Sequence, residues 1–251
     1  MNRSSFKHLL FPIAVLLLAL TQPSTAQDFN EFTFASNKPL KEAYDYAVSL
    51  YEASTGIQKG LNNGTQYAPY PYHLEGHAFF ETAGWSPGSI CYEGMLYKDV
   101  KLLYDLITGE VIVPYKDTYM QLHQDRINKF TINQHQFIRI APDSASALGL
   151  SPGFYEQLYN NQLKVLARYS KNVQEEEIMN EKQYVVYSKR WYYLKIGDKY
   201  HQADNERMVL NLLKDKDKDI AQFIKKNKLS FKSNKELALT RIAAYYEQLK
   251  N

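Results

Sequence analysis

Apolar and polar residues alternate most clearly in the middle of the chain, within residues 88–115. Apolar side chains recur at every second position over residues 100–106, a period that is typical of a strand with one buried face. Thr108-Gly109 interrupts the run, and an apolar stretch resumes over residues 111–113. The pattern therefore predicts two antiparallel strands joined by a tight turn, at the centre of a β-rich core.

Further short segments with strand-like composition lie on both sides of this hairpin, separated by turn residues. We expect them at residues 30–36, 78–80, 89–92, 119–123, 127–132, 136–140, 154–159, 163–169, 183–187, 191–196 and 199–202. Asn160-Asn161 and Gly197-Asp198 would each join two of these segments as a hairpin. By contrast, the acidic residues 174–181 suggest a helical turn, and the small residues of 142–152 suggest a loop.

Helical spacing of apolar residues is found near both ends of the chain. It predicts one helix over residues 39–53 and two more over residues 205–214 and 217–226. A third C-terminal helix should start at Ser233, which forms a capping box with Glu236. Each C-terminal helix has a narrow apolar stripe, so these helices should pack on the sheet or on one another.

These elements together predict an α+β fold with a predominantly antiparallel, curved β-sheet, an N-terminal helix and a small helical C-terminal unit. The composition changes near Asp204. We therefore expect residues 1–26 to be a signal peptide, residues 27–203 a β-rich core domain with the N-terminal helix, and residues 204–251 a helical unit packed on that core.

The first residues have the pattern of a secretory signal peptide. Arg3 and Lys7 form a basic start, and residues 9–20 are apolar throughout. Ser24-Thr25-Ala26 then supplies the small residues that a signal peptidase recognises. The apolar run is shorter than the roughly 20 residues that span a bilayer, so a retained membrane anchor is the less favoured alternative. We expect cleavage after Ala26, export to the periplasm or beyond the cell, and no later transmembrane segment.

Composition narrows the class of partner and the source of stability. The formal net charge is +3, and Arg3 and Lys7 supply two of those charges, so the mature chain would be nearly neutral. Such a chain gives no reason to expect nucleic acid as a partner. Cys91 is the only cysteine, so the core must hold the fold without an intramolecular disulfide. The 21 tyrosines are explained either by cross-strand aromatic pairs or by an aromatic binding cleft.

Residues 84–88 match the G-x-S-x-G pattern of serine hydrolases, with Ser86 in the nucleophile position. That pattern needs a strand before the serine and a helix after it, whereas here a strand is expected to follow. Pro87 also lacks the backbone N–H that would stabilise the oxyanion. We therefore interpret the segment as a turn between strands.

His73 and His77, in the sequence His-Leu-Glu-Gly-His, suggest a metal site at first sight. Pro71 and Gly76 disfavour the helix that would bring the two imidazoles together. On a strand they would stand about 13 Å apart, too far for one ion whose ligands lie at about 2 Å. Solvated loop histidines are the favoured interpretation, and a loop that joins them at a metal is the alternative.

Asp215, Asp217 and Asp219 alternate with lysines, as carboxylates do in a calcium loop. The sixth position of such a loop would be Ile220 instead of glycine, and the twelfth would be Lys226 instead of glutamate. A charged link between two helices is the favoured interpretation.

Cys91 is a candidate nucleophile if His123 or His135 lies beside it in space. It belongs to an apolar strand candidate, where a free cysteine is usually buried and unreactive. These motifs leave no residue that we assign to catalysis, to a cofactor or to a metal.

A succession of short motifs carries a resemblance. The motifs are Asn63-Gly64-Thr65-Gln66-Tyr67, Gly88-Ser89-Ile90-Cys91-Tyr92-Glu93-Gly94, Tyr104-Asp105, Gly153-Phe154-Tyr155-Glu156 and Phe223-Ile224-Lys225-Lys226-Asn227. In this succession the chain resembles an uncharacterised family of bacterial secreted or envelope proteins, over nearly the whole mature sequence. Because the motifs are turns and aromatic strand positions, the resemblance implies a shared fold rather than a particular activity, and it transfers no functional residues.

The favoured hypothesis is an exported, non-enzymatic protein that binds a ligand or a protein of the cell envelope. A curved sheet closed by helices could hold an apolar ligand, and its aromatic surface or the basic C-terminal residues could equally contact a partner. The basic residues are Lys225, Lys226, Lys228, Lys232 and Lys235.

The alternative is a hydrolase that acts on envelope or extracellular polymers. Such an enzyme should present a cleft with two carboxylates or a histidine beside a nucleophile, whereas a binding protein should present an apolar cavity or an aromatic patch.

Overall fold

The computed structural model describes Ala43, Tyr46 and residues 59–250. The chain divides into two compact units, residues 1–55 and 56–251, and every element described below belongs to the second. No helix among the described residues is long and apolar enough to cross a membrane. The expectations that fall outside the described residues are the signal peptide at 1–26, the strand at 30–36 and, apart from Ala43 and Tyr46, the helix at 39–53.

Twelve strands form one sheet within the described residues. They are β1 (Gly64–Gln66), β2 (Leu74–Glu75), β3 (Ser86–Tyr92), β4 (Met95–Asp105), β5 (Glu110–Tyr115), β6 (Thr118–Leu122), β7 (Ile127–Ile132), β8 (His135–Ile140), β9 (Gly153–Asn160), β10 (Lys164–Ile178), β11 (Glu181–Ile196) and β12 (Lys199–Gln202). Their order across the sheet is β1-β6-β5-β4-β3-β7-β8-β9-β10-β11-β12, with β2 paired to β11 as an additional strand. The short β2–β11 pair is parallel and the other pairs are antiparallel, which confirms the prediction of a β-rich, mostly antiparallel sheet.

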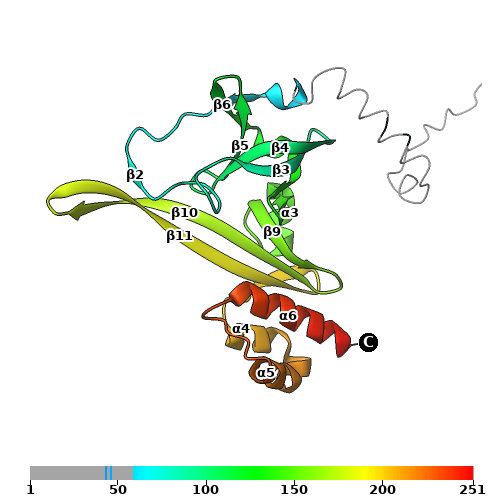
Figure 1. The fold of residues 1–251 in the computed structure, drawn as a ribbon. Coiled ribbons are helices and arrows are strands. Elements are labelled where there is room, and N and C mark those ends of the chain that lie inside the picture. The colour runs from blue at the N-terminus through cyan, green and yellow to red at the C-terminus, as the bar shows by residue number, and fades with distance from the viewer. Residues whose placement is uncertain (1–42, 44–45, 47–58, 251) are drawn as a thin grey trace, which may run out of the picture. The chain divides into compact units, whose positions relative to one another are not determined.

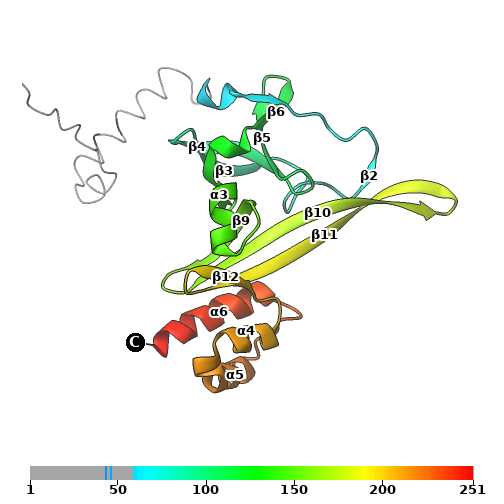
Figure 2. The ribbon, with the colours of Figure 1, turned by 180° about the vertical axis from the view of Figure 1, so that it is seen from behind.

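The sheet is not curled, so the expectation of a curved sheet is wrong. Its two longest strands, β10 and β11, have 15 and 16 residues and pair with each other along almost their whole length. Figures 1 and 2 show this hairpin running past the neighbouring strands, with its turn on the side away from the C-terminal helices. The alternation in the sequence indicates which side chains share a face, but it contains no signal for curvature.

The central hairpin is formed by β4 and β5, as the sequence predicts. Asp105 supports the turn, because its carboxylate accepts hydrogen bonds from the backbone N–H groups of Ile107 and Thr108 at 2.8 and 3.2 Å. Leu102 is fully buried, as expected for a core-facing position. Leu103 on the opposite face is buried as well, so both faces of β4 are covered at this point.

The acidic segment at residues 174–181 is the end of the β10–β11 hairpin, so its interpretation as a helical turn is wrong. Met179 and Asn180 form the hairpin turn with positive φ angles of 55° and 64°, as a two-residue turn of this kind requires. No residue over 170–191 is buried. Over residues 174–182 the sequence therefore lacks the alternation of apolar and polar positions that would indicate strands, whereas the strand predicted at residues 183–187 is confirmed as part of β11.

Residues 142–152, expected as a loop, contain the helix α3 (Pro142–Leu148). The proline at the start of the helix and the left-handed Gly149 at its end, with a φ of 70°, are typical helix boundaries. Ala145 on this helix is buried in a small core cluster with Tyr155 and Tyr200.

Aromatic side chains fill the main core on one face of the sheet. Phe130 and Phe137 stack with their ring centroids 4.8 Å apart. Phe154 and Tyr104 approach Phe130 edge-on, at centroid distances of 5.1 and 5.2 Å. These contacts between strands favour cross-strand pairing, rather than an open cleft, as the reason for the aromatic residues in this region.

Three helices follow the sheet, close to the predicted ranges. They are α4 (Glu206–Leu212), α5 (Asp217–Lys226) and α6 (Lys235–Gln248), and short 3₁₀ turns are η1 (Lys59–Asn62), η2 (Gln124–Arg126) and η3 (Lys214–Lys216). The residue that caps α6 is Asn234, whose side chain accepts a hydrogen bond from the backbone N–H of Leu237 at 2.9 Å. The prediction that Ser233 caps this helix is therefore wrong by one position. Asparagine serves as an N-cap as well as serine does, so the residue type alone could not decide between Ser233 and Asn234.

Helix α6 is attached to the sheet through the buried residue Glu247. The carboxylate accepts hydrogen bonds from the Tyr159 hydroxyl, the Asn161 amide and the Leu163 backbone N–H at 2.7, 3.0 and 2.6 Å. Ile242 on the same helix is buried in the main core. Figures 1 and 2 show the three helices gathered together near the base of the β10–β11 hairpin.

Candidate functional site

Ser86, the central residue of the G-x-S-x-G pattern, is the first residue of β3. It is 6% exposed and lies opposite Leu102 in the register between β3 and β4. A strand therefore continues from Ser86, where a serine nucleophile of this class would be followed by a helix. This geometry favours a structural role for the motif.

His73 and His77 lie in different surroundings. His73 is exposed and stands 3.4 Å from a carboxylate oxygen of Glu75, whereas Nδ1 of His77 is 3.4 Å from the ammonium nitrogen of Lys171. Burial and the adjacent Lys171 charge lower the pKa of His77. The described residues contain no group of three or more His, Cys, Asp or Glu side chains placed to hold a metal ion.

The remaining sequence candidates lie on separate elements. Asp215 in η3 pairs with Lys250 at 2.7 Å, and Asp217 is the first residue of α5. Cys91 is half-buried in β3, between β4 and β7. Asp215 thus belongs to the link between helices that the sequence suggested, and Asp217 and Asp219 lie in the first turn of α5.

The structure brings together a group of titratable side chains that no sequence motif indicates. This group, hereafter the His135 cluster, consists of Glu81, His135, Glu156, Tyr169, Arg190, Tyr192 and Glu236. Its members come from β8, β9, β10 and β11, from the segment before β3, and from α6. Most of them border a pocket of about 260 Å³.

His135 lies between two carboxylates. Its Nδ1 is 2.6 Å from Oε1 of Glu156, and its Nε2 is 3.0 Å from Oε1 of Glu81. Partial burial opposes the imidazolium, but the hydrogen bond and charge of Glu156 and the charge of Glu81 outweigh it and raise the pKa of His135. Both ring nitrogens are therefore engaged, and neither is free to accept a proton from a substrate.

The other carboxylates of the cluster also have donors. Glu156 is 5% exposed and accepts a hydrogen bond from the Tyr169 hydroxyl. Glu236 accepts one from the Tyr192 hydroxyl at 2.9 Å and pairs with Arg190 at 3.4 Å. Burial and these carboxylates raise the pKa of Tyr169 well above its usual value and that of Tyr192 to about 12, so both phenols remain donors. The cluster thus connects the sheet to α6 by hydrogen bonds, such as the one from Tyr192 on β11 to Glu236 on α6.

Sequence reasoning could have found only one member of this cluster. Its residues are far apart in the chain, so no spacing rule connects them. Glu156 is the exception, because it shares the core-facing side of β9 with Phe154, where the alternation predicts an apolar residue. A buried carboxylate at such a position needs hydrogen-bond donors nearby.

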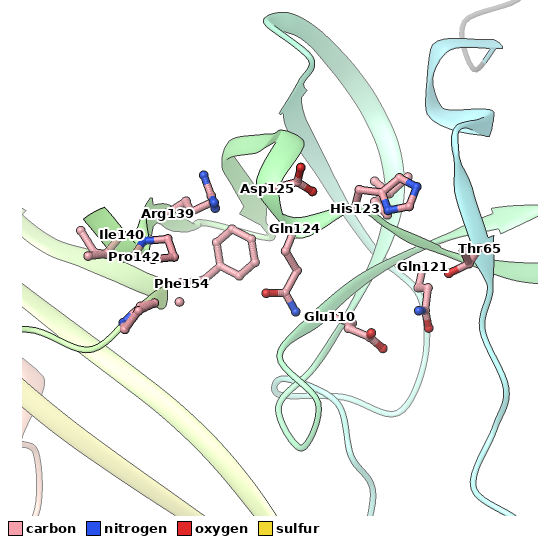
Figure 3. A pocket seen from close by; sticks show the side chains of 13 residues that line it. Thr65, Glu110, Gln121, His123, Gln124, Asp125, Arg139, Ile140, Pro142 and Phe154 are labelled. Atoms are coloured by element: carbon pink, nitrogen blue, oxygen red, sulfur yellow. The ribbon is translucent and has the colours of Figure 1, made fainter. Parts of the chain in front are cut away.

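A second pocket, of about 400 Å³, is shown in Figure 3. It lies on the same face of the sheet as the His135 cluster, at the other end of that face. Along β8, His135, Phe137 and Arg139 alternate onto one face, so the two pockets lie at opposite ends of this row with the aromatic core between them. Register pairs Arg139 with Phe154 on β9, and both line the second pocket. It is hereafter the Arg139 pocket.

The end of the β10–β11 hairpin, residues 170–191, is hereafter the distal hairpin. One of its faces is partly covered by the segment around β2, where Tyr72 stacks on Tyr184 with ring centroids 4.1 Å apart. The opposite face carries the exposed side chains of Tyr187 and Ile178. Met179 in the turn is 93% exposed, so apolar surface is concentrated at this end of the hairpin.

The outer edge of β10 is open over the distal hairpin. β9 pairs with β10 only as far as Ala167, and the backbone N–H of Lys171 donates to the carbonyl of Leu106 at 2.9 Å. Beyond Lys171, no described strand pairs with this edge. An open edge presents backbone N–H and C=O groups to which another strand can bind.

No family model matches the sequence, and the searches of curated proteins and of solved structures returned no significant match. Function is therefore inferred from the chain's own residues and their arrangement.

Proposed function

We propose that this chain is an exported, non-enzymatic interaction module whose distal hairpin binds a protein of the cell envelope. The observation that supports this is a ribbon of about 30 Å, from residue 170 to the turn, in which no side chain is buried. A two-stranded hairpin is marginally stable on its own in water. A partner that docks on this ribbon would therefore stabilise it and bury its apolar side chains.

The open edge of β10 suits a partner that adds a strand. In this mode of recognition, backbone hydrogen bonds give affinity and alternate side chains give specificity. Tyr187 and Ile178 lie on the face that the β2 segment leaves open, and Met179 lies at its end. Ile178, on β10 itself, would be the nearest of these to the added strand, and Tyr187 and Met179 would extend the apolar surface beside it.

The charge near the turn indicates the chemistry of the partner. The acidic residues there are Glu175, Glu176, Glu177 and Glu181. Lys182 opposes them and pairs with Glu175 at 2.7 Å, which leaves an excess of negative charge. Because interfaces are electrostatically complementary, the partner segment should carry lysine or arginine among apolar residues.

A photo-crosslinking amino acid at position 179, in cells of the source organism, tests this proposal. We expect one adduct of discrete mass, since Met179 is the most exposed apolar side chain of the distal hairpin. The same amino acid in place of Lys226, an exposed residue of α5, is the control and should not give that adduct. No discrete adduct from position 179, or the same adduct from both positions, would contradict the proposal.

Two substitutions of an acidic residue by lysine test whether the partner recognises the acidic residues near the turn of the distal hairpin. Glu177→Lys places a positive charge on the distal hairpin, and Asp198→Lys makes the same change at an exposed turn near the opposite end of β11. We expect Glu177→Lys to reduce the adduct from position 179 severalfold and Asp198→Lys to leave it unchanged. Equal yields from both variants would show that the partner does not recognise the acidic surface.

A hydrolase is the second candidate function, because the 260 Å³ pocket places the carboxylates of Glu81 and Glu236 beside His135. This composition fits the cleft expected of an enzyme. Against it, each of these side chains already has a hydrogen-bond or ion-pair partner. Hydrolysis of an envelope polymer by the purified chain, lost in folded Glu81→Gln and Glu236→Gln variants, would replace the binding proposal.

A further inference from the structure

Several polar side chains that line the Arg139 pocket have no hydrogen-bond or ion-pair partner among the described residues. In the part of the chain that the structure describes, the side chains of Arg139, Glu110 and Gln124 make no hydrogen bond and no ion pair. The His135 cluster on the same face differs, because its carboxylates all have donors. The free groups of the Arg139 pocket are therefore available to a ligand.

Arg139 occupies a position where an unpaired charge is unfavourable. It is half-buried on β8, lies opposite Phe154 in register and is two residues from the buried Phe137. A guanidinium beside an apolar core is only partly hydrated, and no described carboxylate pairs with this one. An anionic group bound in the pocket would supply this partner, and a carboxylate matches the forked geometry of the guanidinium.

The opposite charge lies across the pocket. Glu110 is half-buried at the start of β5, and Asp125 belongs to η2. Figure 3 shows Arg139 and Glu110 on different sides of the pocket, with the Gln124 side chain between them. A complementary ligand therefore carries a negative group at one end, a positive group at the other, and a polar group between them.

The backbone around the Arg139 pocket is conformationally restricted, and the pocket has the volume of a small-molecule site. Pro142 and Pro152 restrict the backbone on one side, and Gly153 has a φ of 135°, a conformation that glycine adopts most readily. Phe154, which is 3% exposed, lies beneath them in the core. A volume of about 400 Å³ is in the range of small-molecule sites.

We propose that the Arg139 pocket binds a small zwitterion, an amino acid or a short peptide, with the carboxylate on Arg139 and the ammonium group near Glu110. This site is independent of the distal hairpin, which contributes no residue to its lining. Failure of one proposal therefore leaves the other standing.

Ligand-observed NMR with the full chain tests this proposal, with alanyl-alanine, its N-acetyl derivative, its C-terminal amide and free alanine as probes. We expect saturable binding of the dipeptide at millimolar concentration or below, and about tenfold weaker binding of each blocked derivative, because each lacks one charged contact. Tighter binding of free alanine than of the dipeptide would identify an amino acid as the occupant. Equal binding of the blocked derivatives, or no saturable binding of alanine and the dipeptide, would overturn the proposal.

Two variants assign the two contacts. Arg139→Gln should weaken the dipeptide about tenfold and leave the amide unchanged, and Glu110→Gln should weaken the dipeptide and leave the N-acetyl derivative unchanged. Arg207→Gln, at an exposed position on α4, is the matched control and should bind as the wild type does. Arg139→Gln should keep the wild-type Tm, because Arg139 has no hydrogen bond or ion pair with another described residue to lose. An unchanged dipeptide affinity in the folded Arg139→Gln variant would overturn the assignment.

Discussion

His135 links the stability of this protein to pH through its two carboxylate neighbours. Glu156 and Glu81 raise the pKa of His135 in the folded state despite its partial burial. The folded state therefore binds the proton more tightly than the unfolded state does. This contribution to stability is complete below the unfolded pKa of about 6.5 and is lost as the pH rises through the folded pKa.

We therefore expect the Tm of the wild type to fall more steeply from about pH 6.5 upward than the Tm of a His135→Gln variant, which cannot take up the proton. Thermal denaturation followed by circular dichroism over a series of pH values measures the difference. Parallel pH profiles of the two proteins would mean that the His135 ion pairs make no net contribution to stability.

Glu247 holds α6 against the β9–β10 turn with three hydrogen bonds. Glu247→Leu removes the acceptor for the Tyr159 hydroxyl, the Asn161 amide and the Leu163 backbone N–H. We expect a loss of about 2–4 kcal/mol in the free energy of unfolding, because donors are left unsatisfied near a buried site. Chemical denaturation measures it, with Glu247→Gln as the control, which keeps one acceptor oxygen and should lose less. A loss below about 1 kcal/mol for Glu247→Leu would show that these donors find water instead.

At the scale of elements, Leu102 on β4 is the position of the central hairpin where we expect a charged substitution to reduce stability most. Leu102 is fully buried, and Lys101 beside it is exposed. An aspartate introduced at position 102 would therefore be buried, whereas an aspartate at position 101 would be in water. Leu102→Asp buries an unpaired carboxylate, at a cost comparable to the whole stability of a domain of about 5–15 kcal/mol, and should abolish the cooperative melt. Lys101→Asp should melt near the wild-type temperature. A cooperative wild-type-like melt of Leu102→Asp would show that Leu102 does not face the core.

The elements that the sequence predicts correctly are those with a periodic apolar pattern. The β4–β5 hairpin buries alternate positions such as Val100, Leu102 and Tyr104 in the main core, and the three C-terminal helices bury apolar residues there as well, so their patterns are visible in the sequence. The distal hairpin buries nothing, and its acidic residues occur on both faces, so the sequence predicts only residues 183–187 of it as a strand and misses the turn. Curvature depends on twist and packing, which the alternation does not encode.

The polar sites could not be predicted for a related reason. His135 meets Glu81 and Glu156 only because β8 and β9 pair and the segment before β3 returns to the same face. Arg139 and Glu110 line one pocket although they belong to β8 and β5, which are not neighbours in the sheet. These contacts follow from the register and order of strands, and one sequence does not determine either.

At the scale of the whole described unit, the packed core leaves less room for a ligand than the distal hairpin and the polar pockets do. The face of the sheet that could have held an apolar ligand is filled by aromatic rings in stacked and edge-on contact, including Phe130, Phe137 and Phe154. Polar pockets lie at both ends of that face. Among the exposed large apolar side chains of the described residues, Met179 at the turn of the distal hairpin is the most exposed, at 93%.

The most direct test of the proposed interaction shortens the distal hairpin. Residues 173–186 are removed, and the register partners Asn172 and Tyr187 are joined by an Asn-Gly turn, which suits a two-residue hairpin loop. We expect a cooperative melt within a few degrees of the wild type, because no buried residue is lost. The partner identified by crosslinking the full chain from position 179 is then followed by co-purification, and we expect the shortened chain to lose it. Retention of that partner at the wild-type level, by a folded shortened chain, would contradict the assignment of the distal hairpin as the binding surface.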